Sequence, residues 1–500
     1  MRPRWLGPRL AALAAGALWG ACFAKLQPPL LPFVALAPLF LFLERDDAGW
    51  QGFAHGFGAW AVGLWWIAPT LAIYGDLPWY LALAGLALLA AILALYTAAF
   101  ALAGRRFWRR GGWVAWAASP ALWVLLEWLR ERLLTGFPWN QAAYAWTDFP
   151  GALALAAWIG AAGVSWIGVL PALGVALSIR RRSISPAAVA ILVALLAFAL
   201  GDRFAAPRPA RMAEPRAVRI VQPNTPDRPL YDAEASARDY LRLLRMSSEA
   251  CAPGALVVWP ESAAWPAAWE EDPNLRADVA KLLDRGCAVL LNSPRSAGER
   301  VFNSLYLLSA GSLPEIADKR HLVPFGEYVP LGRAIPWLGK LARNAGDFSA
   351  AEEIRLLPWR GESLAPAVCY EVVFASEVAA AVRAGATAIV TVTNDGWYGD
   401  TAAPWQHFRA ARFRAAESHR WLLRAAITGV SGVIGPDGAV VGQIGVGESG
   451  VLYATFEGRR ELTPFVRAPW VVPAMALLLV TVAEVDARWR RRPAVSPPPA

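Results

Sequence analysis

Three residue types that together can perform acyl transfer occur in the second half of the sequence: a carboxylate, an ammonium group and a thiol. Glu261 follows the run VVWP, Lys319 lies in DKRHLVPFGEYVP, and Cys369 lies in PAVCYEVVF. A carboxylate can accept the proton of a thiol, the thiolate can attack a carbonyl carbon, and a cation can stabilise the resulting oxyanion. The three residues therefore predict covalent acyl transfer through a thioester on Cys369.

Each residue also has an ordinary structural interpretation. A cysteine at the end of an apolar strand is often a small core residue. Glu261 alone can be a turn carboxylate, and Lys319 alone a solvated side chain. Other catalytic systems have less support, since no histidine lies in a nucleophile-elbow or metal-ligand pattern; the four are His55, His321, His407 and His419. We expect no metal, and no cofactor, because a thioester keeps the reactivity of the donor ester.

Short, apolar, β-rich runs must position these residues. They lie at 217–222, 255–259, 288–292, 304–310, 365–369, 386–393 and 429–435, and helical patterns lie between them at 234–250 and 406–426. Such alternation is typical of a layered α/β domain, whose reactive side chains follow the strands. We expect Pro260 to force Glu261 into a turn. We expect Cys369 at a strand-to-helix junction, which can lower the pKa of a thiol.

The composition places much of the remaining chain in lipid. Of 500 residues, 56% are hydrophobic and 26 are Trp, which is too apolar for a soluble enzyme of this size. Runs long enough to predict membrane-spanning helices lie at about 9–25, 28–43, 52–74, 78–103, 112–130, 151–178, 185–201 and 468–484. The first run follows three arginines but lacks a convincing cleavage site, so we predict a retained helix and not a signal peptide.

Basic clusters predict the orientation of these helices. Arginines gather at 2–9, 105–110, 180–182 and 488–492. With eight spans all four clusters fall on one side, which the positive-inside rule makes cytoplasmic. The long segment between the seventh and eighth spans then lies outside the cytoplasm. The net charge of +9 resides largely in these flanks, which indicates contact with anionic lipid and not with nucleic acid.

These patterns divide the chain into five parts. We predict transmembrane helices 1–7 in residues 1–202, a linker at 203–217 that opens with the Pro/Arg/Ala-rich stretch RFAAPRPARMAEPRA, and a catalytic domain at 218–467. A C-terminal transmembrane helix is expected at 468–486 and a cytoplasmic tail at 487–500. A domain of roughly 250 residues is near the upper end for a single core.

Four stretches resemble the apolipoprotein N-acyltransferases, membrane-embedded members of the nitrilase superfamily: VVWPES, DKRHLVPFGEYVP, CYEVVF and VTNDGWYGDTAAPWQHFRAARFRAAESHR. The resemblance extends over the whole chain and implies an αββα sandwich outside the cytoplasm. It implies Glu261 as general base, Lys319 as catalytic lysine and Cys369 as nucleophile. Residues that the family needs near the site are matched by Glu327, Tyr370 and Glu371. Structural roles remain open for two of them, since Glu327 can neutralise Lys319 and Glu371 can favour a helix N-terminus.

The resemblance also implies the reaction and its partners. Cys369 takes an acyl chain from a membrane phospholipid, and the α-amine of the diacylglyceryl-modified N-terminal cysteine of an apolipoprotein accepts it, in the last step of bacterial lipoprotein maturation. The enzyme is expected as a monomer in the inner membrane, with its catalytic domain on the periplasmic side.

Two alternatives belong to other functional classes. A membrane-anchored nitrilase-type amidase would use the same trio on a soluble amide. A transporter would need charged or broken helices within the bilayer. The predicted spans contain few ionisable residues, with Glu127 near the end of one span and His55 at the start of another.

Two further features have open interpretations. Cys251 and Cys287 share the domain outside the cytoplasm, where disulfides are permitted, but we expect both cysteines in the core. The count of predicted spans puts the loop at 130–150 on the same side of the membrane as this domain. We expect the loop to line a substrate entrance with Trp139 and Tyr144.

Overall fold

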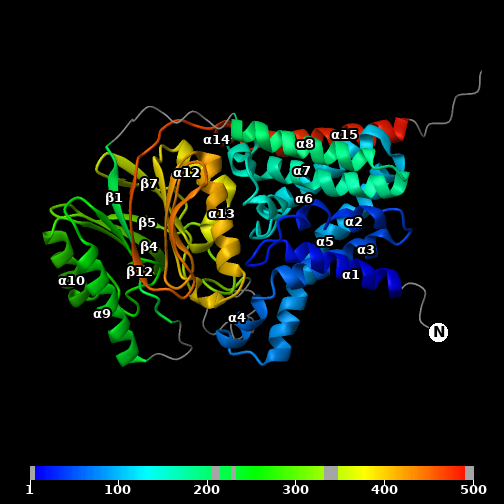
Figure 1. Ribbon diagram of the computed structural model, residues 1–500. Coiled ribbons are helices and arrows are strands. Elements are labelled where there is room, and N and C mark those ends of the chain that lie inside the picture. Colours follow the sequence, from blue (N-terminus) through cyan, green and yellow to red (C-terminus); the bar gives the residue numbers. More distant parts are fainter. Residues whose placement is uncertain (1–5, 204–213, 227–231, 331–346, 490–500) are drawn as a thin grey trace, which may run out of the picture.

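The computed structural model describes residues 6–203, 214–226, 232–330 and 347–489. A bundle of long helices and a domain with two sheets lie end to end (Figure 1). The predicted linker at 203–217 and the tail at 487–500 fall mostly outside the described residues.

The helical part is built from both ends of the chain. Its elements are α1 (Leu6–Ala21), η1 (Leu31–Phe33), α2 (Ala37–Phe42), α3 (Ala48–Gly63), α4 (Ile67–Ile73), α5 (Trp79–Arg110), α6 (Gly112–Arg130), η2 (Ala142–Trp146), α7 (Ala152–Arg181), α8 (Ser185–Arg203) and α15 (Val471–Trp489). Within the described residues, α5, α7 and α8 are each long and apolar enough to cross a membrane. The pair α3 and α4 also passes this test as one span bent by 55°.

Residues 28–43 do not form the continuous helix that the apolar run predicted. They form η1 and the six-residue α2. Prolines at 28, 29, 32 and 38 interrupt this run, and proline removes a backbone donor and sterically opposes a helix interior. The count of eight spans stays a prediction.

The arginines that end two of the long helices lie at the end of the helical part away from the sheets (Figure 1). The helices α5 and α7 both end in arginines. Arg106 pairs with Glu484 of α15 at 2.5 Å, and Arg180 pairs with Glu44 at 2.9 Å. The described N-terminus and the end of α15 lie at this same end (Figure 1).

The second part contains two six-stranded sheets. The first has the order β12-β1-β2-β3-β4-β5 and the second β11-β10-β9-β8-β7-β6. The strands of the first sheet are β1 (Arg216–Gln222), β2 (Leu256–Val258), β3 (Ala288–Ala297), β4 (Arg300–Leu308), β5 (Glu315–Asp318) and β12 (Gly450–Phe456). Those of the second are β6 (Leu357–Trp359), β7 (Glu362–Val368), β8 (Ala388–Thr393), β9 (Trp421–Ala426), β10 (Ser431–Ile434) and β11 (Val440–Ile444).

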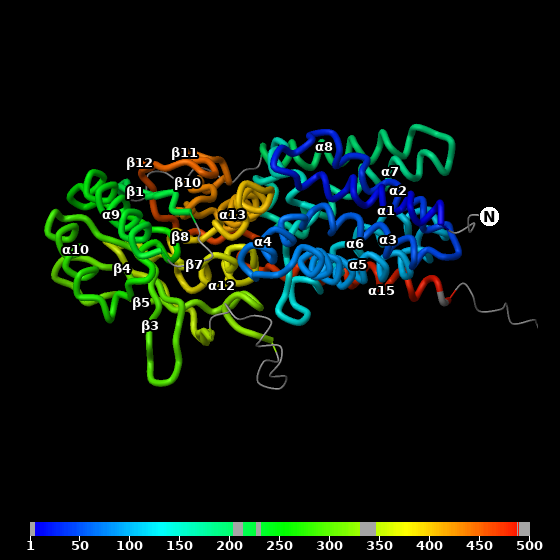
Figure 2. The backbone as a smooth tube through the Cα atoms, turned by 90° about the horizontal axis from the view of Figure 1, so that it is seen from below, coloured from blue at the N-terminus to red at the C-terminus, as the bar shows by residue number. Residues whose placement is uncertain are grey.

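Helices cover the outer face of each sheet. The inner faces share one apolar core, in which Ile220 and Val258 of the first sheet cluster with Val390 of the second. The helices α9 (Ala233–Ala250) and α10 (Pro273–Asp284) cover the first sheet. The helices α12 (Ala375–Arg383) and α13 (Ala403–Ser418) lie between the second sheet and the membrane helices (Figures 1 and 2). The predicted αββα sandwich joined to a polytopic helical domain is confirmed.

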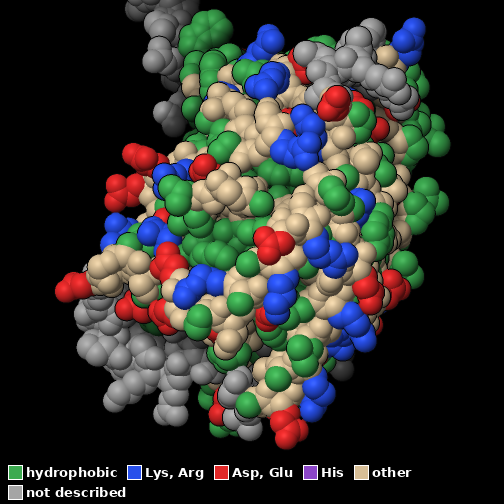
Figure 3. Space-filling model, turned by 90° about the vertical axis from the view of Figure 1, so that its left-hand side faces the viewer, with side chains coloured by type: hydrophobic (Ala, Val, Ile, Leu, Met, Phe, Trp, Pro, Cys, Tyr) green, Lys and Arg blue, Asp and Glu red, His purple; other side chains and the backbone are tan. Residues whose placement is uncertain are grey.

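Nearly all of α13 is buried, whereas α12 leaves Arg383 exposed at its end. A single apolar cluster combines residues of α13, such as Phe413, with residues of α7, such as Val169. The opposite end of the domain, around α9 and α10, instead carries charged side chains of both signs (Figure 3).

The helix predicted at 406–426 is too long. It ends at Ser418, and His419 adopts a left-handed conformation with φ 52°. Residues 421–426 form β9, which pairs in parallel with β8. Short apolar runs do not distinguish a buried helix from a buried strand by periodicity, which explains the error.

Cys251 and Cys287 form a disulfide, so the expectation that both would be unbridged core residues is wrong. Cys251 follows α9 and Cys287 precedes β3. The bond therefore ties the helical layer to the first sheet.

Candidate active site

Cys369 lies directly after β7, where the second sheet gives way to the short helix η3 (Cys369–Val373). Its backbone has φ 54°, a conformation that is uncommon for a residue with a side chain. Its Sγ accepts a hydrogen bond from Thr393 Oγ1 at 3.3 Å, and its carbonyl oxygen accepts one from His407 Nε2 at 3.0 Å. The strand-to-helix junction predicted for Cys369 is present, and contacts from both sides hold it in an unusual backbone conformation.

Lys319 is buried directly after β5, with 1% of its surface exposed. Its Nζ lies 2.9 Å from Glu327 Oε1, 2.8 Å from Glu327 Oε2 and 3.9 Å from Glu261 Oε1. A buried ammonium group requires such partners, because an isolated charge is very costly away from water. The solvated-lysine interpretation is therefore excluded.

Asn303 of β4 links the two carboxylates. Its Nδ2 donates to Glu261 Oε1 at 3.0 Å and to Glu327 Oε1 at 2.8 Å, and Asn292 holds its Oδ1 at 2.6 Å. The other oxygen of Glu261 accepts from the backbone N–H of Asn394 at 2.9 Å. We did not predict Asn303 or Asn292, because a polar residue within a strand gives no sign of which side chain it will meet.

Electrostatics couple these groups to the thiol. Burial and the charge of Glu261 raise the pKa of Cys369, against the lowering effect of Lys319. The lowered thiol pKa expected from a helix N-terminus is therefore not found. Burial also raises the pKa of Glu261, which Lys319 opposes. Burial would lower the pKa of Lys319, but Glu327 and Glu261 raise it overall, so the amine stays charged.

Glu371 binds backbone groups on two segments of the site. Its Oε1 accepts from the N–H groups of Arg320 and His321 at 2.7 and 3.0 Å, and its Oε2 accepts from Val368 N–H at 2.7 Å. It thus ties the segment after Lys319 to the turn before Cys369, and burial raises its pKa. Its position at the start of η3 agrees with the electrostatic role at a helix N-terminus and adds a structural one.

Aromatic side chains lie at the interface between the sheet domain and the membrane helices. The Tyr370 hydroxyl donates to the carbonyl oxygen of Gly136 at 3.2 Å. Its ring stacks on the ring of Trp139, with 6.2 Å between the two ring centroids. Tyr144 packs instead on Phe413 at 5.1 Å. Trp139 and Tyr144 are each 2% exposed, so they lie within the interface between the two parts and not at an open entrance.

A buried charge network supports the backbone of Cys369. Asp395 Oδ2 accepts from Arg424 Nη2 at 2.7 Å, and its Oδ1 lies 3.0 Å from His407 Nδ1. Burial alone would raise the pKa of Asp395, but Arg424 and His407 lower it to about 2. Burial and Arg424 lower the pKa of His407, against the raising effect of Asp395, and its Nε2 donates to the carbonyl oxygen of Cys369.

Sequence reasoning missed this network. His407 and Asp395 lie in the quoted stretch VTNDGWYGDTAAPWQHF, but the histidines match neither a nucleophile-elbow nor a metal-ligand pattern, so the sequence predicted no role for His407. Arg424 lies in the run that was predicted as a helix, and its charge within WLLRAA was the available signal. In the described part of the chain, no group of three or more His, Cys, Asp or Glu residues is arranged to hold a metal.

Replacing Thr393 with Val is expected to raise the pKa of Cys369, because the hydroxyl that stabilises the thiolate is lost. A hydrogen bond to a charged group contributes about 1.5–3 kcal/mol, so alkylation of Cys369 at neutral pH should slow about 10-fold or more. The measurement is the rate of iodoacetamide adduct formation against pH.

Thr391→Val is the matched control for Thr393→Val. Thr391 is buried two residues earlier on β8, and its hydroxyl has no hydrogen-bond partner among the described residues. Its variant should alkylate at the unchanged rate. Equal pH profiles for the two variants would contradict the assigned role of Thr393.

The geometry suits acyl transfer through a thiol. A carboxylate of raised pKa and a charged amine both act on one cysteine, and a buried network fixes the backbone on which this cysteine sits. These are the components of nucleophilic catalysis with a base and a cationic stabiliser.

Comparisons with known proteins place both parts in described families. Residues 15–174 match the family described as "Apolipoprotein N-acyltransferase N-terminal domain", and residues 217–463 match "Carbon-nitrogen hydrolase". A protein named apolipoprotein N-acyltransferase from Brucella suis biovar 1 is 35% identical over 517 residues, which cover 95% of this chain and 94% of that protein. One of the same name from Geobacter metallireducens is 34% identical, covering 89% and 88%.

Solved structures resemble the sheet domain at lower identity. A CN-hydrolase superfamily protein from Xanthomonas campestris is 20% identical, covers 53% of this chain and 97% of its own, and gives a TM-score of 0.37. An amidase from Nesterenkonia sp. is 21% identical, covers 52% and 96%, and gives 0.38.

Proposed function

Because the chain belongs to the apolipoprotein N-acyltransferase family, we propose that Glu261, Lys319 and Cys369 are the catalytic residues of its acyl transfer. The enzyme N-acylates apolipoproteins at the α-amine of the diacylglyceryl-modified N-terminal cysteine. The acyl donor is a membrane phospholipid, and transfer proceeds in two half-reactions through a thioester on Cys369.

In the first half-reaction, Glu261 accepts the proton of the Cys369 thiol and the sulfur attacks the ester carbonyl of the phospholipid. Lys319 stabilises the negative charge that develops on the carbonyl oxygen. The bond between the acyl carbon and the glycerol oxygen breaks, and the leaving oxygen takes the proton from Glu261. The products are a lysophospholipid and the acyl-enzyme.

In the second half-reaction, the α-amine of the apolipoprotein attacks the thioester carbonyl. The carbon–sulfur bond breaks, an amide forms, and the proton lost by the amine returns to the sulfur through Glu261. Glu327, Asn303 and Glu371 position the groups that react, because they bind Lys319, Glu261 and the backbone beside Cys369.

The observation that carries this proposal is the burial of Lys319 between Glu327 and Glu261, in electrostatic contact with Cys369. If Lys319 only stabilised the fold, we would not expect it to lie beside a thiol. The domain that holds both residues also packs against membrane helices. One substrate is a membrane lipid and the other is lipid-modified. Helices that hold the active site at the bilayer therefore raise the effective concentration of both substrates at the site.

Orientation and division of the chain follow the same reasoning. The arginines that end α5 and α7 lie at the end of the bundle away from the catalytic domain, which supports a catalytic domain on the periplasmic side of the bacterial inner membrane. Residues 1–202 and 468–486 form the membrane part, residues 218–467 form the catalytic part, and the enzyme acts as a monomer.

The test is the mass of the intact protein after incubation with a phospholipid of one defined acyl chain. A gain of one acyl group, absent from Cys369→Ala and discharged by a diacylated lipopeptide with a free N-terminus, supports the mechanism. Discharge by water at the same rate without the lipopeptide would contradict a transferase. No adduct on folded protein would contradict the nucleophile.

A further inference from the structure

Two buried ionisable side chains, Glu127 and Arg130, lie on α6 at its end nearest the catalytic domain. They are 7% and 4% exposed and stand three residues apart, on one face of the helix. Ionisable residues within membrane helices are costly and commonly mark function. No step of the proposed reaction uses either residue.

Both residues bind the backbone of one loop, residues 137–146, which we call the interface loop. Arg130 Nη1 donates to the carbonyl oxygens of Phe137 and Trp139 at 2.8 and 2.5 Å. Glu127 Oε1 accepts from the backbone N–H of Ala142 at 2.7 Å. The charges thus hold the loop on both sides of its left-handed residue Asn140, whose φ is 48°.

The other side of the interface loop contacts the catalytic domain through Trp139. Its Nε1 donates to Gln406 Oε1 at 2.7 Å, and its ring stacks on Tyr370 and lies 5.5 Å from the ring of His407. His407 holds the carbonyl oxygen of Cys369. A continuous set of contacts therefore joins the charged pair of α6 to the neighbours of the nucleophile.

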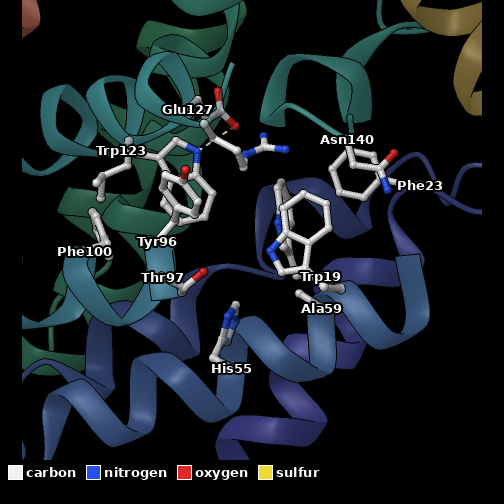
Figure 4. A pocket seen from close by; sticks show the side chains of 13 residues that line it. Trp19, Phe23, His55, Ala59, Tyr96, Thr97, Phe100, Trp123, Glu127 and Asn140 are labelled. Carbon is white, nitrogen blue, oxygen red and sulfur yellow. Dashed lines mark hydrogen bonds between the residues drawn. The ribbon is translucent and has the colours of Figure 1, made fainter. Parts of the chain in front are cut away.

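A cavity of mixed lining lies beside the charged pair, between α1, α3, α5 and α6 (Figure 4). Glu127, Thr97, His55 and Asn140 direct polar groups toward it, among aromatic side chains. Within the described residues, no hydrogen-bond partner is found for Glu127 Oε2, Asn140 Oδ1 or either ring nitrogen of His55.

The size of the cavity decides what it can accommodate. It offers about 50 Å³ to the centres of water-sized molecules, and one water needs roughly 10–15 Å³ by this measure. A few waters fit in this space. The cavity is therefore suited to hydrating Glu127 and the interface loop.

We propose that Glu127 and Arg130 are positioning residues, which fix the interface loop so that Trp139 supports Tyr370 and His407 beside Cys369. The inference rests on the proposed function, since acylation of Cys369 is its main readout. It assigns the membrane part a role in aligning the active site, in addition to holding the enzyme in the bilayer.

The first test is Arg130→Lys in the full-length protein. Lysine keeps the charge but lacks the planar fork that reaches two carbonyl groups. Acylation of Cys369 should slow by about 10-fold to 10²-fold, the size of effect expected when a reacting group is misplaced by about 1 Å. The readout is the rate of the mass gain under saturating phospholipid, together with the unfolding midpoint.

Arg180→Lys is the matched control. Arg180 also donates to a backbone carbonyl, that of Trp108 at 2.6 Å, pairs with Glu44, and lies over the Trp108 ring. It sits at the opposite end of the bundle. The inference requires that Cys369 is acylated slowly in Arg130→Lys and at the wild-type rate in Arg180→Lys. The two variants must also have similar unfolding midpoints. Equal losses in both variants, or none in Arg130→Lys, would overturn it.

Glu127 supplies a second, independent test. Glu127→Gln keeps an oxygen that accepts from Ala142, whereas Glu127→Leu does not, so only the leucine variant should slow acylation. If the wild-type protein itself is never acylated, the proposed function fails, but the inference is still decided by alkylation of Cys369 with iodoacetamide. Arg130→Lys must then change the alkylation rate or its pH dependence several-fold while Arg180→Lys does not; equal profiles would reject it.

Discussion

Replacing Lys319 with Met is expected to slow acylation of Cys369 by at least about 10²–10³-fold, the typical loss when one stabiliser of an oxyanion is removed. Methionine fills similar space but carries no charge. It leaves Glu261 and Glu327 without the Lys319 ammonium group, which lies 3.9 Å from Glu261 Oε1 and 2.8 Å from Glu327 Oε2. The measurement is the rate of acyl-adduct formation by mass, with the unfolding midpoint recorded in parallel.

A double variant separates catalysis from stability. Removing one partner of a buried ion pair commonly costs about 3–5 kcal/mol, because the other charge stays buried and unpaired. Lys319→Met combined with Glu327→Gln removes that unpaired charge and should recover much of the unfolding midpoint. Acylation should remain as slow as in the single variant. Recovery of acylation along with stability would show that Lys319 is only structural.

Glu261→Gln is expected to have the second large effect, a loss of about 10²–10⁴-fold in acylation, which is the range attributed to general base catalysis. Glutamine keeps the shape of the side chain and one oxygen, which can accept from Asn303 Nδ2 or from the Asn394 N–H but not from both. It cannot accept the thiol proton. An acylation rate within a few-fold of the wild type would assign the base to another group.

The pH dependence provides a further check on Glu261. The residue acts only when ionised, and burial raises its pKa above the ordinary 4.5. As pH falls through that raised pKa, the ionised fraction and the acylation rate should fall together, so the acid limb should lie above pH 4.5. The exposed Glu271 gives the control, since Glu271→Gln should keep this limb. A limb at or below pH 4.5 would contradict the assignment.

Much of the catalytic domain follows from local patterns. The apolar runs at 217–222 and 386–393 became β1 and β8 because alternation and β-branched residues specify strands wherever a sheet buries them. Glu261 and Cys369 were predicted to lie close together because each follows a predicted strand, and strand ends gather in an α/β domain. Lys319 was selected from DKRHLVPFGEYVP, and the strand β5 before it was not predicted. The helix prediction was wrong at β9, because an apolar run beside a helix does not indicate the strand with which it will pair.

The contacts between distant segments were beyond local reasoning. Asn303 meets Glu261 across 42 residues, and Arg424 meets Asp395 across 29. Hydrogen bonds of this kind depend on which strands become neighbours, and spacing along the chain does not encode that. The Cys251–Cys287 bond is a similar case, because the distance between two cysteines is set only by the folded layers.

Adjacent positions on α13 face different halves of the molecule. Gln406 donates to the carbonyl oxygens of Phe23 and Gly63 in the membrane part, while His407 binds Cys369. A shortened chain that begins near residue 217 would lose the first set of bonds and expose the apolar face that α13 shares with α7. Truncation to obtain a water-soluble catalyst is therefore expected to yield an aggregating, misaligned protein, and biochemical work needs the whole chain in detergent or lipid.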